Sequence, residues 1–383
     1  MLVVDDEPDL ESLIRQKFRK QIREGEYEFL FAHNGVDALE KIVDHPDLSL
    51  ILSDINMPEM DGLTLLQKLN DIKNRSLKSV IVSAYGDMQN IRTAMNLGAF
   101  DFVTKPINFG DLEVTINKTL QELQIIKRAM QEHDQLVAVQ RDLNIATRIQ
   151  QSILPQTFPP FPDRTEFEIY AQMIPAKEVG GDFYDFFFID HDRLAFVIGD
   201  VSGKGVPAAI FMAVSRTLLK ATASQLVNPG ECLRRVNSML IAESDAEMFV
   251  TIFYGVLNTR TGEVQYSSGG HNSPYIVRAN GNVEPLEGTG GIFLGKIDNL
   301  EYDVHKTSLQ HGDTLFMYTD GVTEAMNKER NVFADTRLVE CLQRSKGQSL
   351  EKMLNCIYTE VTSFAAGAPQ SDDITMMTLR YNA

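Results

Sequence analysis

Short apolar runs alternate with amphipathic stretches along the first 118 residues. We predict a strand at each run, because each is short and bounded by polar or turn residues. The predicted strands are Met1–Val4, Phe29–Ala32, Leu50–Ser53, Val80–Ser83 and Asp101–Thr104. The predicted helices are Glu7–Arg23, Val36–His45, Gly62–Ile72, Met88–Leu97 and Phe109–Thr119. This alternation predicts a doubly wound α/β domain over residues 1–118, with a five-stranded parallel sheet.

Residues 111–154 contain neither proline nor glycine, and their apolar positions recur at helical spacing. One helix face carries Leu123, Ile126 and Met130. A second seam, offset by one residue, consists of Leu136, Val139, Leu143, Ala146, Gln150 and Ile153. We predict a helical, coiled-coil linker over residues 119–160 that pairs two copies of the chain into a homodimer. The alternative is a helix that packs against its own domains.

The pattern becomes rich in strands over residues 161–383. The predicted strands are Glu168–Met173, Leu194–Asp200, Phe249–Asn258, Glu263–Gly269, Tyr275–Ala279, Thr314–Thr319 and Thr375–Arg380. Helices are expected after Gly205, after Pro229 and near Leu350–Ala365. Many strands with a few helices between them predict an α/β sandwich of two sheets with helices outside.

Composition narrows the class of protein. A length of 383 residues suits two domains and a linker. The formal net charge of −17 argues against nucleic acid as a partner. No apolar run reaches the roughly 18 residues of a membrane helix, and no signal peptide opens the sequence, so we expect a cytoplasmic protein without a membrane segment. Three cysteines without metal-ligand spacing argue against a disulfide framework.

Polar residues end several of the predicted parallel strands. Asp5 and Asp6 follow the first strand, Asp54 the third, Ser83 ends the fourth and Lys105 follows the fifth. Chemistry gathers at the carboxyl edge of such sheets. Acidic side chains there can hold one magnesium ion through oxygen ligands. Asp54 would then be a nucleophile that forms an acyl phosphate, with the Ser83 hydroxyl and the Lys105 ammonium binding the phosphoryl oxygens.

These residues closely resemble the CheY-like response-regulator receiver family, through the phrases VVDDE, SDINMPEMDG, VSA and TKP. The resemblance covers about residues 1–120. It implies that Asp54 is phosphorylated, so that a sensor histidine kinase or phosphotransfer protein is the partner. It also implies that Asp6 and Asp54 bind magnesium directly while Asp5 assists.

The receiver resemblance has three further implications. The carbonyl of Asn56 would be a magnesium ligand, and the bond between Lys105 and Pro106 would be cis. Phe102 matches the aromatic residue that switches conformation in this family.

A second group of carboxylates lies beside glycines or strand ends. Asp182 stands in VGGDFYDF, Asp200 in IGDVSGKG, Asp320 in YTDGVTEA, and Asp372 and Asp373 in SDDIT. Glycine allows the backbone to approach an ion closely. All-oxygen sites select magnesium, manganese or calcium. Two such cations close together are a known device for hydrolysing phosphate esters.

These segments look like the metal-dependent protein phosphatases of the PPM family, in the bacterial branch typified by SpoIIE and RsbU. The phrase RDLNIATRIQQSILP resembles the helix that precedes the catalytic domain in that branch. The resemblance implies two manganese or magnesium ions. Asp182, Asp200 and the Val201 carbonyl would share one ion, and Asp200, Asp320 and Asp372 would hold the other.

Some roles in this second group stay open at the level of sequence. Asp372 and Asp373 stand where the eukaryotic members of the family usually have Asp-Asn. That alignment makes Asp372 the ligand and Asp373 its neighbour, but either could be used. No arginine comparable to the phosphate-binding arginine of the eukaryotic enzymes is evident. Lys204 is expected to be a solvated loop residue, and His271 a turn residue beside or outside the site.

The branch implies that the substrate is a phosphoserine or phosphothreonine on an anti-sigma-factor antagonist. One alternative is a non-catalytic phosphatase-like domain that binds a partner under control of phosphorylation. A diguanylate cyclase is a weaker alternative, since Gly180–Phe183 lacks that family's glutamate. A DNA-binding regulator would need a basic recognition helix, which the carboxy-terminal half does not show.

Overall fold

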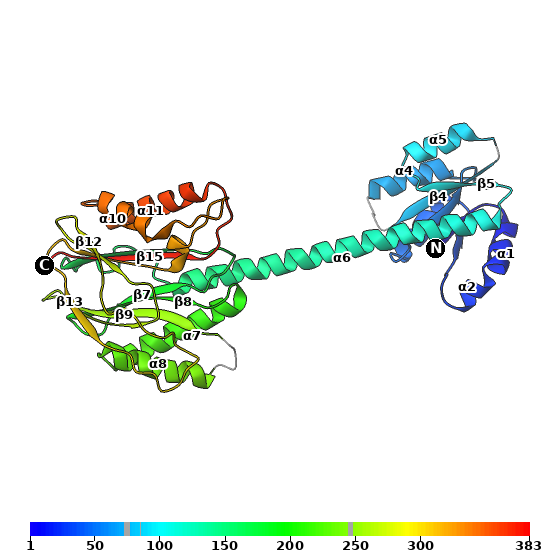
Figure 1. The fold of residues 1–383 in the computed structure, drawn as a ribbon. Coiled ribbons are helices and arrows are strands. Elements are labelled where there is room, and N and C mark those ends of the chain that lie inside the picture. Colours follow the sequence, from blue (N-terminus) through cyan, green and yellow to red (C-terminus); the bar gives the residue numbers. More distant parts are fainter. Residues whose placement is uncertain (73–76, 85, 244–247) are drawn as a thin grey trace. The chain divides into compact units, whose positions relative to one another are not determined.

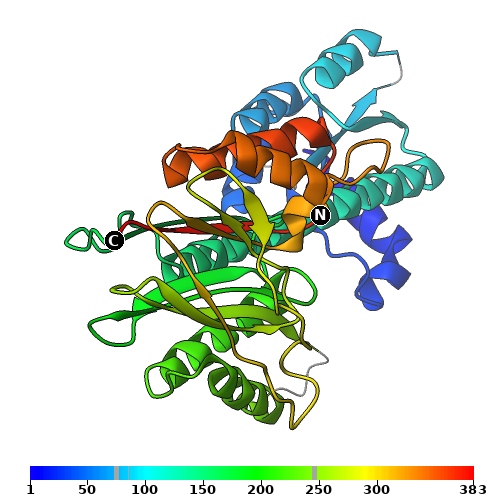
Figure 2. The ribbon, with the colours of Figure 1, turned by 60° about the vertical axis from the view of Figure 1, so that its left-hand side comes forward.

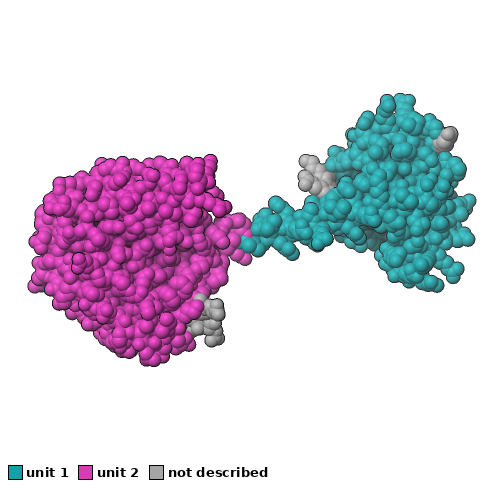
Figure 3. Space-filling model, in the orientation of Figure 1, with its two compact units in different colours: residues 1–139 teal, residues 140–383 magenta. Residues whose placement is uncertain are grey.

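The computed structural model describes residues 1–72, 77–84, 86–243 and 248–383. These residues form two compact units, Met1–Val139 and Gln140–Ala383, coloured teal and magenta in Figure 3. One long helix, α6 (Phe109–Ile153), begins in the first unit and ends in the second. Each unit has its own hydrophobic core.

The first unit is built on a five-stranded parallel sheet with the order β2-β1-β3-β4-β5. The strands are β1 (Leu2–Val4), β2 (Leu30–Ala32), β3 (Leu50–Asp54), β4 (Lys78–Ala84) and β5 (Asp101–Lys105). Side chains of β3 alternate between two cores: Leu50 and Leu52 pack on one face, and Ile51 packs on the other. The predicted doubly wound sheet is confirmed.

Helices cover both faces of this sheet (Figure 1). They are α1 (Pro8–Lys17), α2 (Arg19–Arg23), α3 (Gly35–Asp44), α4 (Gly62–Ile72), α5 (Met88–Asn96) and the first part of α6. The prediction of one helix over Glu7–Arg23 was wrong, because the helix is interrupted at Phe18. The Phe18 side chain is fully buried among Tyr27 and Phe29, and its backbone leaves the helical conformation there.

The second unit is a sandwich of two five-stranded sheets in which the paired strands run antiparallel. One sheet has the order β13-β10-β9-β8-β7 and the other β12-β11-β14-β15-β6. The strands are β6 (Phe167–Ile174), β7 (Phe183–Phe188), β8 (Arg193–Val201), β9 (Val250–Asn258), β10 (Glu263–Gly269), β11 (Tyr275–Val277), β12 (Val283–Pro285), β13 (His305–Ser308), β14 (Thr314–Tyr318) and β15 (Ile374–Tyr381).

A pair of helices packs outside each sheet of the sandwich, as Figures 1 and 2 show. Helices α7 (Val206–Ala223) and α8 (Pro229–Glu243) lie on the sheet that contains β8. Helices α10 (Ala334–Arg344) and α11 (Leu350–Ala365) lie on the sheet that contains β15, and the single turn α9 (Asp320–Thr323) follows β14. The predicted sandwich with outer helices is confirmed, although β7, β12, β13 and α10 were not predicted.

Helix α7 is long and apolar enough, by length and composition, to meet the test for a membrane span. The prediction concerned uninterrupted apolar runs, and this helix is interrupted by Ser215, Arg216 and Lys220. The helix packs against the outer face of the sheet that contains β8, where its side chains Phe211, Met212 and Leu219 are buried.

The apolar positions of α6 differ in burial between the start, the middle and the end of the helix. Leu123 is buried in the first unit, whereas Leu136 and Val139 are 70% and 57% exposed. Further along, Gln150 is buried and Ile153 is partly covered within the second unit. The final turns of α6 therefore pack against their own domain, as the alternative interpretation expected, and the middle of the helix carries the free apolar positions.

Candidate functional sites

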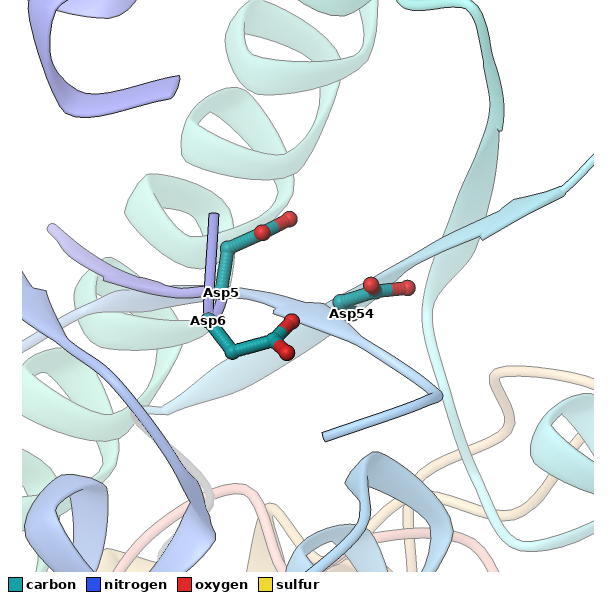
Figure 4. Close-up of side chains that lie close together, drawn as sticks. All are labelled: Asp5, Asp6 and Asp54. Atoms are coloured by element: carbon teal, nitrogen blue, oxygen red, sulfur yellow. The ribbon is translucent and has the colours of Figure 1, made fainter. Parts of the chain in front are cut away.

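Three carboxylates meet at the carboxyl edge of the parallel sheet. Each of Asp5, Asp6 and Asp54 offers an oxygen atom within 4.8 Å of the others, and Figure 4 shows the three side chains gathered at the ends of β1 and β3. Asp5 is buried and also accepts a hydrogen bond from the Glu7 amide at 2.9 Å. The set offers oxygen donors alone, which fits a hard divalent cation such as magnesium.

Lys105 places a fixed cation beside these carboxylates. Its ammonium lies 2.8 Å from Asp54 Oδ2 and 3.0 Å from Asp5 Oδ2. Burial alone would lower the pKa of Lys105, but its bonds to Asp54 and Asp5 outweigh burial and raise the pKa above its ordinary value. Burial raises the pKa of Asp5, and the Glu7 amide and Lys105 oppose that effect. The amine therefore stays charged at the point where a phosphoryl group would add negative charge.

Other residues named from the sequence surround this carboxylate group. The Ser83 side chain is buried at the end of β4, and its hydroxyl has no hydrogen-bond partner among the described residues, which leaves it available to a ligand oxygen. The Lys105–Pro106 bond is cis. Asn56 is exposed two residues after Asp54, and Phe102 is 38% exposed on β5. Gly62 packs so closely on the Asp54 carbonyl that any Cβ would collide with it.

The phosphatase-like carboxylates come from four separated segments of the sandwich. Asp182 directly precedes β7, Asp200 lies near the end of β8, Asp320 opens α9 and Asp372 precedes β15. Both sheets therefore contribute to one region. The connection is direct, because the Thr319 hydroxyl donates a hydrogen bond of 2.7 Å to Asp182 Oδ2.

These four carboxylates share one electrostatic environment. Burial raises the pKa of Asp182 well above its ordinary value, and the charges of Asp200 and Asp373 add to the effect. Burial and the charge of Asp320 raise the pKa of Asp200 to about 7. Burial and the charge of Asp372 raise the pKa of Asp320 to about 6. Such mutual repulsion among oxygen donors is relieved by bound cations, so the residues fit a divalent metal site.

The spacing of this cluster differs from that of the receiver site. Within the described parts of the chain, the three receiver aspartates are the group of three whose oxygens all lie within 4.8 Å of one another. The phosphatase carboxylates are spread more widely. The main chain of Gly181 also lies close to the Val201 carbonyl beside these carboxylates. A Cβ added at Gly181 would be only 2.8 Å from the Val201 carbonyl oxygen.

Asp372 and Asp373 are adjacent but have different surroundings. Asp373 is buried, and its two oxygens accept hydrogen bonds of 2.7 Å each from the amides of Ala176 and Gly181. The Asp372 side chain is 34% exposed and forms a 2.9 Å ion pair with Lys204. Asp373 therefore braces the backbone beside Asp182, whereas Asp372 is the more available ligand.

Lys204 is not the purely solvated loop residue that the sequence suggested. Besides pairing with Asp372, its ammonium donates a hydrogen bond to the Ser371 carbonyl. The lysine follows Asp200 by four positions, and the partner segment lies 167 residues further along. Nothing in the local sequence signals this contact, because only the folded sandwich brings the two segments together.

His271 is fully enclosed in the domain. Burial lowers its pKa to about 4, so the ring is neutral near pH 7. Its Nδ1 lies 2.9 Å from the Thr251 hydroxyl, and Thr251 pairs with Asp200 across β9 and β8. The histidine thus lies beside β9, and β9 separates it from the strand that carries Asp200.

The fold and the two sites define a receiver domain followed by a metallophosphatase-type sandwich. Residues 1–117 match the response regulator receiver domain, and residues 190–382 match the family described as Stage II sporulation protein E (SpoIIE). The chain belongs to the SpoIIE family of phosphatase domains and carries a response-regulator receiver domain at its amino-terminal end.

Individual relatives resemble one part or the other. Protein IcfG of Synechocystis is 32% identical over 63% of this chain and 42% of its own length. The phosphoserine phosphatase RsbU of Bacillus subtilis is 28% identical over 66% of this chain and 75% of its own. The chemotaxis protein CheY of the same bacterium is 35% identical over 31% of this chain and 96% of its own.

Solved structures support the fold of the second unit. The SiaA-PP2C domain of Pseudomonas aeruginosa superimposes with a TM-score of 0.58 and 21% identity, covering 64% of this chain and 98% of that domain. This likeness concerns the fold alone. The present chain spans less than half of the length of IcfG.

Proposed function

We propose that this chain is a response regulator whose phosphorylated receiver controls a metal-dependent phosphoserine/phosphothreonine protein phosphatase. The observation that carries the proposal is the cluster of buried, mutually repelling carboxylates where the two sheets of the sandwich meet. Similarity to RsbU, a phosphoserine phosphatase, supports the hydrolysis of phosphoserine as the reaction. We place the protein in the cytoplasm, as expected from the sequence.

We assign the metal ligands from the geometry and the family resemblance together. Asp182, Asp200 and the Val201 carbonyl would hold one manganese or magnesium ion, and Asp200, Asp320 and Asp372 the other. Such ions supply a hydroxide nucleophile and neutralise phosphoryl charge. Asp200 belongs to both sets, so the ionised state of this one carboxylate matters most.

In the receiver, Asp54 is the proposed acceptor of a phosphoryl group from a histidine kinase or phosphotransfer protein. Magnesium would be held by Asp6, Asp54 and the Asn56 carbonyl, with Asp5 assisting. Lys105 orients the Asp54 carboxylate through its 2.8 Å contact. The free Ser83 hydroxyl supports its role as a hydrogen-bond partner of a phosphoryl oxygen. Phe102 is the proposed switch residue.

The proposed substrate is a small anti-sigma-factor antagonist carrying a phosphoserine or phosphothreonine. Dephosphorylation would free the antagonist to bind its anti-sigma kinase and so release a sigma factor. This assignment rests on family resemblance. The alternative, a non-catalytic module that only binds the antagonist, predicts complex formation without release of phosphate.

Removal of metal tests the enzymatic proposal. EDTA should abolish phosphate release from a phosphorylated antagonist, and added manganese or magnesium should restore it. Asp200→Asn should lower turnover by roughly 100-fold or more, because a catalytic metal contributes several kcal/mol and each 1.36 kcal/mol is tenfold in rate. Full activity in that variant would contradict the two-metal assignment, and metal-independent binding without hydrolysis would favour the alternative.

A further inference from the structure

A single glutamine near the end of α6 forms two hydrogen bonds with the backbone beside the proposed metal site. Gln150 Nε2 donates a hydrogen bond of 2.6 Å to the Gly180 carbonyl, and the Gly180 amide donates one of 3.0 Å to Gln150 Oε1. The Gln150 side chain is buried, with 6% of the residue exposed. The Gln150 carboxamide thus pairs with both the amide and the carbonyl of Gly180.

Gly180, the residue that Gln150 holds, lies two positions before Asp182. The intervening Gly181 is held from the other side, where its amide donates to Asp373 Oδ2 at 2.7 Å. A Cβ on Gly180 would collide with the Asp373 carboxylate, so the turn fits tightly between α6 and the segment before β15. Position and direction of the Asp182 main chain are therefore set by these two side chains.

The sequence around Gln150 shows that this contact is specific. Gln150 occupies an apolar seam position of α6, where an aliphatic residue would suit simple packing, whereas the neighbouring Gln151 is exposed. One turn earlier, the Thr147 hydroxyl donates a hydrogen bond of 2.6 Å to the Glu178 carbonyl. The last turns of α6 thus follow the backbone of residues 178–180 with polar contacts.

We propose that Gln150 is a positioning residue for Asp182: by holding Gly180, it keeps the proposed metal-binding carboxylate in place. This inference rests on the proposed function, because it takes Asp182 as a metal ligand. Gln150 itself is assigned no contact with metal or substrate, because its carboxamide is occupied by the backbone of Gly180. Outer residues that orient a metal ligand typically contribute roughly ten- to 100-fold in metal affinity.

The test is manganese binding to the full chain without substrate, measured by calorimetry or by the electron paramagnetic resonance signal of free Mn²⁺. Gln150→Met keeps the length of the side chain but removes both hydrogen bonds, and it should weaken binding by roughly tenfold or more. Turnover at saturating manganese should fall far less, because the ion itself draws Asp182 back. Gln151→Met, a matched change on the exposed side of the helix, should leave both quantities unchanged.

Native manganese affinity in folded Gln150→Met would overturn the inference. If that variant does not fold, Gln150→Glu decides, since it keeps an acceptor for the Gly180 amide but sets a carboxylate against the Gly180 carbonyl. Weakened binding in Gln150→Glu supports the inference, and unchanged binding rejects it. Asp182→Asn separates the two proposals: if it binds manganese like the native chain, the proposed metal site is wrong, whereas loss of binding there with native affinity in Gln150→Met rejects the role of Gln150 alone.

Discussion

Asp54 is the residue on which the receiver chemistry depends. Its carboxylate accepts a 2.8 Å hydrogen bond from the Ile55 amide through Oδ1 and pairs with Lys105 through Oδ2. Asparagine has almost the same shape, so Asp54→Asn should preserve the fold within about 1 kcal/mol while removing the nucleophilic oxygen. Incubation with labelled acetyl phosphate should label the native chain and leave Asp54→Asn unlabelled. Stoichiometric label on the variant would show that another residue is the acceptor.

Asp200 leads to a prediction about pH and stability in the absence of metal. Because the folded-state pKa of about 7 exceeds the ordinary value, the folded protein binds a proton more tightly than the unfolded chain. The free energy of unfolding should therefore fall as pH rises from about 4 through 7. We expect the melting temperature of the phosphatase unit in EDTA to be lower at pH 8 than at pH 5.5.

The matched comparison is Asp200→Asn, which removes this titrating group. Its melting temperature in EDTA should depend less on pH than that of the native chain over the same interval. Manganese should also restore most of the stability that the native protein loses at pH 8, because the cation replaces the proton as counter-charge. An equal pH slope in the two proteins would mean that Asp200 is already ionised at the lower pH.

At the scale of the element, α6 combines two kinds of surface. Its ends are covered by the domains that they enter, whereas Leu136 and Val139 are largely exposed. Exposed aliphatic residues at coiled-coil spacing indicate a second helix, and we propose that this helix comes from another copy of the chain. Ile153 is unsuitable as a probe of pairing because it is partly covered within the phosphatase unit.

A double substitution tests this pairing. Leu136→Lys with Val139→Lys should convert the proposed homodimer to a monomer in light-scattering measurements, because four lysines would face each other across the seam. The phosphatase should also lose its response to beryllofluoride while keeping metal-dependent activity. Substitution of the exposed Gln140 by lysine is the control. A dimeric variant that responds normally would show that α6 is a simple spacer.

Several elements show where periodicity fails as a guide. Leu10, Ile14, Phe18 and Ile22 repeat every four residues, which predicts one helix, yet the chain turns at Phe18 to bury that ring. Strand β7 is a run of aromatic residues with strong β-propensity, a signal that could have identified it. Strands β12 and β13 are short and largely uncovered, so pairing with their neighbours alone defines them.

At the scale of the whole molecule, one chain carries a proposed phosphorylation site and a proposed hydrolytic site on separate folds. Coupling between two sites in one protein typically changes ligand affinity by about five- to 150-fold, and we take the lower end as the scale for turnover. We predict that beryllofluoride with magnesium changes turnover on a phosphorylated antagonist by roughly fivefold or more, while the melting temperature of the phosphatase unit changes little. An Asp54→Asn chain should not respond. Equal turnover with and without beryllofluoride would contradict receiver control of the phosphatase.

The sequence alone predicted the order of the domains and the chemistry that we propose for each site. Hydrophobic periodicity is a local property, and it predicted the parallel sheet and the sandwich. The carboxylates at strand ends, such as Asp54 and Asp200, could be predicted as site residues. Strand ends and glycine turns are places where main chain and side chains commonly bind ligands. Their oxygen donors also predicted hard divalent cations, because the type of residue fixes which donor atoms a site can offer.

Only the tertiary structure decided which side chains support those carboxylates. The pairs Gln150 with Gly180, Thr319 with Asp182 and Lys204 with Ser371 join residues 30, 137 and 167 positions apart. Such contacts leave no periodic or local signal, because they depend on how two sheets and a helix pack together. For the same reason, packing distinguished Asp373, whose oxygens both accept hydrogen bonds from backbone amides, from its half-buried neighbour Asp372, although the two side chains are chemically identical.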